Sequence, residues 1–217
     1  MTPEYLLKEY ELCFEQLRFY DTRHEDLTKY LFTLASAVAA AEFAVLEFLK
    51  STTPPFYASL AVLSLIVFVA TILLYVAMLQ NRLYFVFVAR QINAIRGYLM
   101  ATEAPGFKGN QMYTRVDLPA FRFRSLHTVS LAGTALISSV FAGSTAYGVT
   151  SYLALANRCL IVGLATVLAA VLELALGVVY LQSSGRQAAN DFLATEKGKP
   201  EQPNPPYSEP AARSPQG

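Results

Sequence analysis

Apolar and aromatic side chains recur in alternating steps of three and four residues along the first 45 residues of the chain. This pattern is typical of a helix that packs against another helix along its whole length. His24 is the position that departs from the apolar or aromatic choice. The seam consists of Leu6, Tyr10, Cys13, Leu17, Tyr20, His24, Leu27, Leu31, Leu34, Val38, Ala41 and Val45.

The two halves of this seam differ in their surroundings. Up to residue 29 the seam is flanked by charged side chains, whereas from residue 30 the chain is apolar on all sides. No proline or glycine interrupts the stretch between Pro3 and Leu49. The pattern predicts one helix that begins in water, pairs with a neighbour and continues into a lipid bilayer.

Four segments are long and apolar enough to cross a bilayer, which requires about 20 residues. They are residues 30–49, 56–79, 126–155 and 159–181. Very short linkers join the first to the second and the third to the fourth, so each pair is expected to form a hairpin. We therefore predict an all-α fold: an integral membrane four-helix bundle whose first two spans extend into a long antiparallel cytoplasmic helical hairpin.

Basic residues set the expected orientation. Residues 1–29 hold four Lys and Arg, 80–125 hold seven and 182–217 hold four, whereas each short linker holds one. By the positive-inside rule, both termini and the central loop are expected in the cytoplasm, at an inner (plasma) membrane of bacterial type. The predicted cytoplasmic parts are a stalk helix at 1–29, a return helix at 80–102, a loop at 103–125 and a tail at 182–217.

Two breaks are expected toward the C-terminal end. Ser183-Ser184-Gly185 is expected to end or kink the fourth helix, and a short helical remnant can follow it. Prolines gather after Gly198, so the tail is expected to be disordered from about residue 198.

The return helix carries a seam that matches the stalk helix. Its members are Phe85, Val88, Ile92, Ile95 and Leu99. The first 29 residues hold seven acids and four bases, a net charge of −3, whereas residues 80–100 hold three arginines and no acid. This complementarity favours a paired stalk over two separately solvated amphipathic helices.

A turn centred near residue 53 pairs residues whose numbers add up to about 106. In that register Arg96 falls near Glu11 and Glu9. Arg90 falls near Glu15, and Arg82 falls near Glu25 and His24. His24 is then a candidate hinge or switch, and the alternative is a plain interfacial histidine. Each exposed ion pair is expected to contribute at most about 1 kcal/mol.

Polar side chains inside the predicted spans are the main candidates for function. A charge near the bilayer centre is costly, so Glu42 and Glu173 are expected to face protein or a cavity. They could serve a proton or cation step, or each could be a protonated glutamate that donates an interhelical hydrogen bond. Ser130, Thr134 and Ser138 recur every four residues and form either a packing surface or a hydroxyl-lined ion path.

Arginines and aromatic residues meet just before the third span. Arg122 and Arg124 lie in the run Phe-Arg-Phe-Arg, which suits the lipid headgroup zone. The hypothesis is a site for anionic lipid headgroups, and the alternative is ordinary positive-inside anchoring.

Composition and motifs narrow the class of function. The hydrophobic fraction is 54%, the mean hydropathy is +0.36 and the formal charge is +1, so no bulk attraction to nucleic acid is expected. The sequence carries no catalytic, phosphate-binding or metal-binding motif, and no cofactor is expected. Cys13 and Cys159 fall on opposite sides of the membrane in the predicted topology.

The sequence therefore favours a non-enzymatic polytopic membrane protein. We expect its stalk to assemble into a homo-oligomer or to receive a cytoplasmic protein partner, as in an effector that perturbs or gates the membrane. Two alternatives remain open: a small ion channel or proton-coupled transporter that uses Glu42 and Glu173, and a membrane anchor or scaffold. The expected partners are the lipid bilayer, further copies of the chain and a cytoplasmic protein.

Overall fold

The computed structural model describes residues 3–49, 53–103 and 119–197. Within these residues it contains helices and no strand, which confirms the all-α prediction. All four helices are long and apolar enough to cross a membrane. They are α1 (Pro3–Leu49), α2 (Pro54–Glu103), α3 (Leu126–Tyr152) and α4 (Arg158–Lys197).

Local sequence explains where the helices begin and end. The 50-residue helix α2 begins with two prolines, which are tolerated in a first turn because its N–H groups have no helical acceptor. Helix α3 begins after Ser125, whose hydroxyl accepts a hydrogen bond from the backbone N–H of Thr128. It ends at Tyr152, shortly before Ala154, which has a positive φ of 51°.

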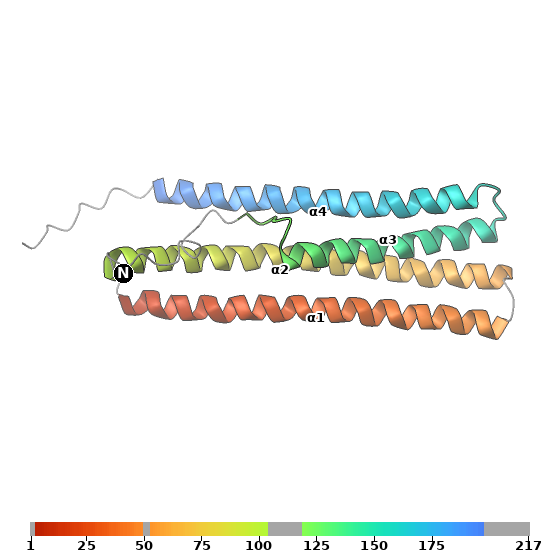
Figure 1. Cartoon of the computed structure of the whole chain (residues 1–217), viewed down its shortest axis with the longest axis horizontal. Helices are drawn as coiled ribbons and strands as arrows, with labels where there is room; N and C mark the ends of the chain where they lie inside the picture. The colour runs from red at the N-terminus through yellow and green to blue at the C-terminus, as the bar shows by residue number, and fades with distance from the viewer. Residues whose placement is uncertain (1–2, 50–52, 104–118, 198–217) are drawn as a thin grey trace, which may run out of the picture.

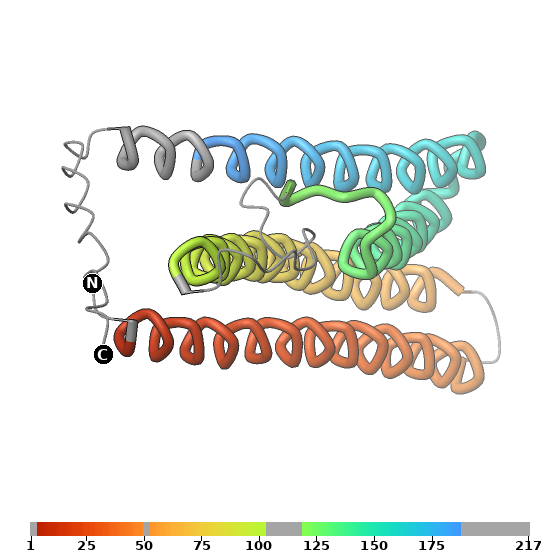
Figure 2. The backbone as a smooth tube through the Cα atoms, turned by 60° about the vertical axis from the view of Figure 1, so that its left-hand side comes forward, coloured from red at the N-terminus to blue at the C-terminus, as the bar shows by residue number. Residues whose placement is uncertain are grey.

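The helices share one long axis (Figure 1), with α2 and α3 in the middle and α1 and α4 on opposite sides of them. The tube in Figure 2 shows the same order from another side. Helix α3 is much shorter than its neighbours, so it accompanies them along only part of their length.

Helices α1 and α2 run antiparallel in close contact (Figure 1). Near one end, Arg96 Nη2 donates a 2.6 Å hydrogen bond to the hydroxyl of Tyr10. Toward the other end, the Ser64 hydroxyl donates a 2.6 Å hydrogen bond to Glu42 Oε1. The residue numbers of both pairs add up to about 106, the value expected for a turn near residue 53.

The hydrophobic core has two parts. The larger part lies where α2, α3 and α4 meet, and includes Met78, Ala135 and Leu181. A smaller cluster of Cys13, Val88 and Ile92 lies between α1 and α2. The most apolar stretches of α1 and α4 are only 6% buried, against 39% for α3, so these two helices present wide apolar faces outward.

A glycine allows α3 to approach α2 closely. A Cβ atom on Gly148 would lie 2.7 Å from the backbone nitrogen of Ala61 and 2.8 Å from the carbonyl oxygen of Tyr57. These neighbours are backbone atoms, which cannot swing aside as a side chain can. Close backbone approach through small residues is how helices associate where lipid supplies no hydrophobic drive.

The expected break at Ser183-Ser184-Gly185 does not end α4, which continues to Lys197. Tertiary contacts hold this stretch: Arg90 Nη1 donates a 3.1 Å hydrogen bond to the Gly185 carbonyl, and Ala120 packs against Gly185. The predicted disordered tail from about residue 198 and most of the predicted loop at 103–125 lie outside the described residues.

Candidate functional site

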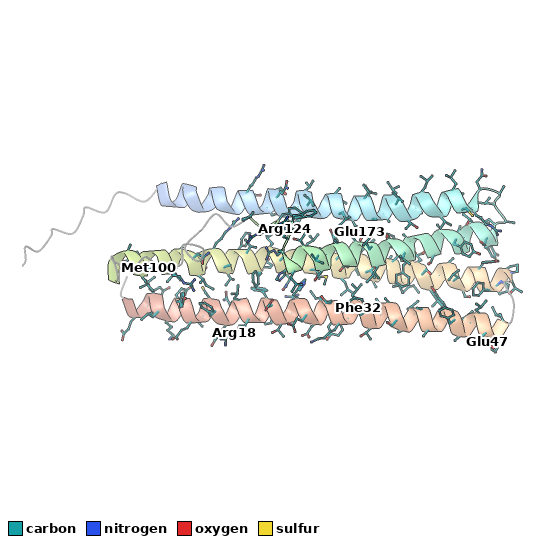
Figure 3. All side chains as sticks on the ribbon, viewed as in Figure 1. Arg18, Phe32, Glu47, Met100, Arg124 and Glu173 are labelled. Carbon is teal, nitrogen blue, oxygen red and sulfur yellow. The ribbon has the colours of Figure 1, made fainter. Side chains whose placement is uncertain are left out.

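A chain of polar contacts joins α2, α3 and α4 in the middle of the bundle. The Ser138 hydroxyl of α3 donates a 2.6 Å hydrogen bond to Glu173 Oε1 of α4. The hydroxyl of Thr71 on α2 lies 3.0 Å from that of Ser138. Thr71 and Ser138 are completely buried. Figure 3 labels Glu173 and shows its place on α4.

Glu173 is also held through its backbone. The hydroxyl of Tyr75 donates a 2.9 Å hydrogen bond to the Glu173 carbonyl oxygen, and it passes close over Gly177. The second carboxyl oxygen of Glu173, Oε2, is buried and has no hydrogen-bond partner among the described residues. The network therefore leaves one carboxyl oxygen able to take a further hydrogen bond or a proton.

Glu42 belongs to a separate contact between α1 and α2. Its Oε1 accepts the hydrogen bond from Ser64, whose side chain is completely buried. Ser64 and Thr71 lie two turns apart on α2, about 10 Å at 1.5 Å per residue. The two carboxyls thus contact hydroxyls of the same helix at two depths.

The other predicted hydroxyls bond mainly within their own helix. The Thr134 hydroxyl donates to the Ser130 carbonyl at 2.8 Å and lies 3.3 Å from Met78 Sδ. Ser130 is half-buried. Of this stripe, Ser138 is the residue that bonds a carboxyl on another helix.

A second cluster lies where α3 begins, between α1 and α2. The imidazole rings of His24 and His127 have centroids 4.3 Å apart, and the ring of Phe85 lies 4.9 Å from that of His127. The guanidinium of Arg82 lies over the Phe85 ring, 5.6 Å from its centroid. Both histidines and Arg82 are buried. We call His24, His127, Phe85 and Arg82 the junction cluster.

Burial governs the titration of this cluster. It lowers the pKa of His24, an effect that Arg82 adds to and that Asp21 and Glu25 oppose. Burial and the nearby Arg122 lower the pKa of Arg82. Three imidazole nitrogens, Nδ1 and Nε2 of His24 and Nε2 of His127, are buried without a hydrogen-bond partner in the described part of the chain.

The residues of the two predicted seams lie between α1 and α2. Val88, Ile92 and Cys13 form the small core cluster, and Tyr10, Leu17 and Tyr20 pack against it. Leu6, His24 and Ile95 are buried as well, and Leu27, Phe85 and Leu99 are half-buried. Asn81 Nδ2 donates a 2.8 Å hydrogen bond to the Tyr20 carbonyl and adds a polar contact to this interface.

The stalk arginines contact neutral oxygen atoms. Arg96 bonds the Tyr10 hydroxyl, Arg90 bonds the Gly185 carbonyl, and Arg82 Nε donates to the Ala120 carbonyl at 3.1 Å. Glu25 lies 4.0 Å from Lys29 on its own helix, so Glu25 and Arg82 have different partners.

The carboxylates near the N-terminal end of α1 differ in their contacts. Glu9 accepts a 2.7 Å hydrogen bond from Gln91 Nε2, which joins α1 to α2. Glu11 and Glu15 are exposed on the surface of α1. Glu9 therefore links α1 to the return helix through a side-chain hydrogen bond.

The segment before α3 exposes the predicted headgroup residues. Arg122 and Arg124 are exposed, and Phe123 between them is 82% exposed. Figure 3 labels Arg124 on this segment.

The sequence did not single out three polar residues of these contacts, Ser64, Thr71 and Tyr75 of α2. It also did not predict the contact of His127 with His24. The seven-residue spacing of Ser64 and Thr71 within an otherwise apolar span is a signal that could have found two of them, because such spacing puts both hydroxyls on one face. The contact between the histidines joins residues far apart in the chain and has no local signal.

The described residues contain no group of three or more His, Cys, Asp and Glu that could hold a metal ion. No protein-family model, curated protein or solved structure matches the chain. The arrangement of the residues is therefore the basis for the proposals that follow.

Proposed function

We propose that this chain is a non-enzymatic integral membrane protein whose cytoplasmic stalk forms an oligomer or binds a protein partner. Either association would shift the membrane-spanning parts of the helices. The proposal rests mainly on the continuity of α1 and α2, which run unbroken for 47 and 50 residues. Contacts join them both in the stalk, at Tyr10–Arg96, and within the spans, at Glu42–Ser64. Two helices linked at both levels move together, so a displacement of the stalk reaches the half-buried carboxyl of Glu42.

The outer face of the stalk supports an assembly role. Tyr5, Leu12 and Phe19 are 53%, 46% and 59% exposed, and they follow one another at seven-residue intervals along α1. An exposed apolar stripe with this period fits the packing of a further helix. We call these three residues the outer stripe, and we propose a second copy of the chain as its occupant.

Changing the outer stripe tests the assembly role. Leu12→Glu and Phe19→Glu are expected to reduce the mass of the particle in a mild detergent, measured by light scattering. Arg18→Glu, exposed on the same helix but outside the stripe, is the matched control and is expected to leave the mass unchanged. A wild-type monomer, or equal loss in all three variants, would contradict the proposal and favour an anchor or scaffold.

Two natural cysteines test the membrane placement. Cys159 is exposed at the start of α4, whereas Cys13 is buried in the stalk. In intact cells a membrane-impermeant maleimide is expected to label the protein through Cys159, and the Cys159→Ser variant is expected to stay unlabelled. The Cys13→Ser variant serves as the control and is expected to label as the wild type does. Labelling that persists in Cys159→Ser would refute the topology.

A second function, proton-coupled transport, is supported by one specific observation: the network of Thr71, Ser138 and Glu173, with Oε2 of Glu173 unpartnered. An ionisable side chain inside a span is a functional candidate by default. In liposomes with an internal pH-sensitive dye, Glu173→Gln and Glu42→Gln are expected to lower proton uptake. Glu47→Gln, at the exposed end of α1 (Figure 3), is the control. Wild-type flux in both variants, or no flux in the wild type, would exclude the pathway.

A further inference from the structure

Among the described residues, Arg82 carries a buried positive charge without a counter-charge. Only 8% of its surface is exposed, and its Nε donates to a neutral carbonyl oxygen, that of Ala120. The charged neighbour that acts on it is another cation, Arg122. The salt bridges of the described residues join Lys29 to Glu25 and Asp26 and do not include Arg82. Because a buried charge is stable only when it is paired, this position favours an anion.

Further donors gather at the same place. His24 and His127 bring buried, unpartnered imidazole nitrogens from α1 and α3. The first turn of α3 starts here. Ser125 caps the N–H of Thr128, whereas the N–H groups of Leu126 and His127 have no acceptor among the described residues and lie at the positive end of the helix. The carboxylates that act on His24, Asp21 and Glu25, are exposed on α1, where Glu25 is paired with Lys29.

The surface beside these donors is suited to a lipid. Phe123 is 82% exposed and Leu126 is 75% exposed, next to the exposed Arg122 and Arg124. Large apolar side chains beside arginines are the arrangement found where acyl chains meet headgroups. A free ion would leave these two apolar side chains exposed to water, whereas the acyl chains of a lipid would cover them. This surface therefore favours a phospholipid as the source of the anion.

We propose that Arg82, Arg122 and the N-terminal turn of α3 bind the phosphate group of an anionic phospholipid in the cytoplasmic leaflet. Arginine presents forked N–H donors that match phosphate oxygens, and the histidines add donors behind them. Phe123 and Leu126 lie among the acyl chains of the same lipid. The site depends on the membrane placement proposed above, but not on the role of the stalk in assembly.

The test uses the full chain in nanodiscs of phosphatidylcholine that contain a minor fraction of phosphatidylglycerol. Native mass spectrometry then counts the lipids that stay bound after release from the disc. The wild type is expected to retain phosphatidylglycerol selectively. Arg122→Gln and Arg82→Gln are each expected to lower this retention about tenfold or more, the effect of losing a charge-assisted hydrogen bond.

Controls separate this site from general surface charge. Arg18→Gln, an exposed arginine in the stalk, is expected to retain phosphatidylglycerol as the wild type does. Arg122 is exposed, so its variant decides the outcome even where Arg82→Gln fails to fold, as judged by helical content. Equal retention of both lipids by the wild type, or an equal loss in the Arg18 and Arg122 variants, would overturn the proposal.

A second arm separates lipid from free phosphate. Inorganic phosphate is added to the protein in detergent, and its effect on the thermal midpoint is compared with that of phosphatidylglycerol. We expect the lipid to raise the midpoint more, and Phe123→Ser to reduce the lipid effect. Stabilisation by phosphate alone, unaffected by Phe123→Ser, would reassign the site to the free ion. Failure of Cys159 labelling would instead refute the membrane placement, so the two failures are distinguishable.

Discussion

The imidazole ring of His24 on α1 lies against that of His127 on α3, with 4.3 Å between their centroids. Both residues are buried, and the Arg82 guanidinium acts on His24 as a like charge when that ring is protonated. The contact joins α1 directly to α3, two helices that otherwise meet mainly through α2. A charge on either ring would therefore weaken the link between them.

This contact predicts a stability that falls at acidic pH. Burial lowers the pKa of His24 below its ordinary value of 6.5, so the folded ring stays neutral where the unfolded one is protonated. Below about pH 6.5 the unfolded state binds more protons, and the free energy of unfolding falls as the pH drops. One histidine contributes at most about 1.4 kcal/mol per pH unit. Thermal midpoints in detergent between pH 7.5 and 5 measure the effect.

His24→Phe is the control for this pH dependence. The phenyl ring keeps an aromatic contact with His127 but binds no proton, so the fall in midpoint with acid is expected to be smaller than in the wild type. An identical fall in both proteins would show that His24 does not titrate as its burial implies.

Gly148 is expected to be intolerant of any side chain. Gly148→Ala places a methyl group against the backbone of α2, 2.7 Å from the Ala61 nitrogen, and the helices must separate to admit it. Overpacking of this kind costs about 1–3 kcal/mol. Gly133→Ala on the same helix is the matched control, because nothing lies within 4 Å of its Cβ position. Chemical denaturation in detergent compares them, and equal stability would contradict this packing.

Ser138→Ala is expected to destabilise the bundle by about 1–3 kcal/mol, because it removes the hydrogen bond to Glu173 and leaves that carboxyl without its serine partner. Ser139→Ala is the control, since the Ser139 hydroxyl is equally buried but bonds the carbonyl of Leu136 in its own helix. A smaller effect of Ser138→Ala in the Glu173→Gln background would measure the coupling between the two side chains. If both serine variants lower the free energy of unfolding equally, the interhelical bond adds no more stability than a hydrogen bond within one helix.

The Tyr10 hydroxyl is expected to stabilise the far end of the stalk. Tyr10→Phe removes the 2.6 Å hydrogen bond from Arg96 but keeps the ring over which the guanidinium lies at 5.6 Å. A loss of about 0.5–1.5 kcal/mol is expected. Faster amide exchange in the first turns of α1 would report it, and Lys8→Gln, exposed on the same helix and outside the outer stripe, is the control. Unchanged exchange in Tyr10→Phe would mean that the bond does not hold the two helices.

Much of the architecture was predictable because its signals are local. The uninterrupted run from Pro3 to Leu49, the prolines at the start of α2 and the apolar stretches each act within a few turns of helix. The expected register of α1 against α2 also agrees with the pairs Tyr10–Arg96 and Glu42–Ser64. A short connection near residue 53 leaves the two helices little freedom to slide against each other. The expected break at Gly185 was wrong as an end of the helix, because contacts with Arg90 and Ala120 hold that stretch.

The candidate site was predictable only in part. The cost of burying a charge singled out Glu42 and Glu173, but nothing local indicated which hydroxyl would face each of them. The arginines of the return helix were assigned to acids by charge alone, and Arg82 instead bonds a backbone carbonyl. A guanidinium can be satisfied by any oxygen within reach, so composition alone does not select its partner.

The sequence by itself determined four long helices, their capacity to cross a bilayer and the seam between α1 and α2, because periodicity and helix breakers act through neighbouring residues. Only the tertiary structure decided that Ser138 bonds Glu173, that Gly148 lies on the backbone of α2 and that His24 meets His127. These pairs come from segments far apart in the chain. Their contact depends on how each helix is rotated and shifted against the next, which the packing of the whole bundle sets.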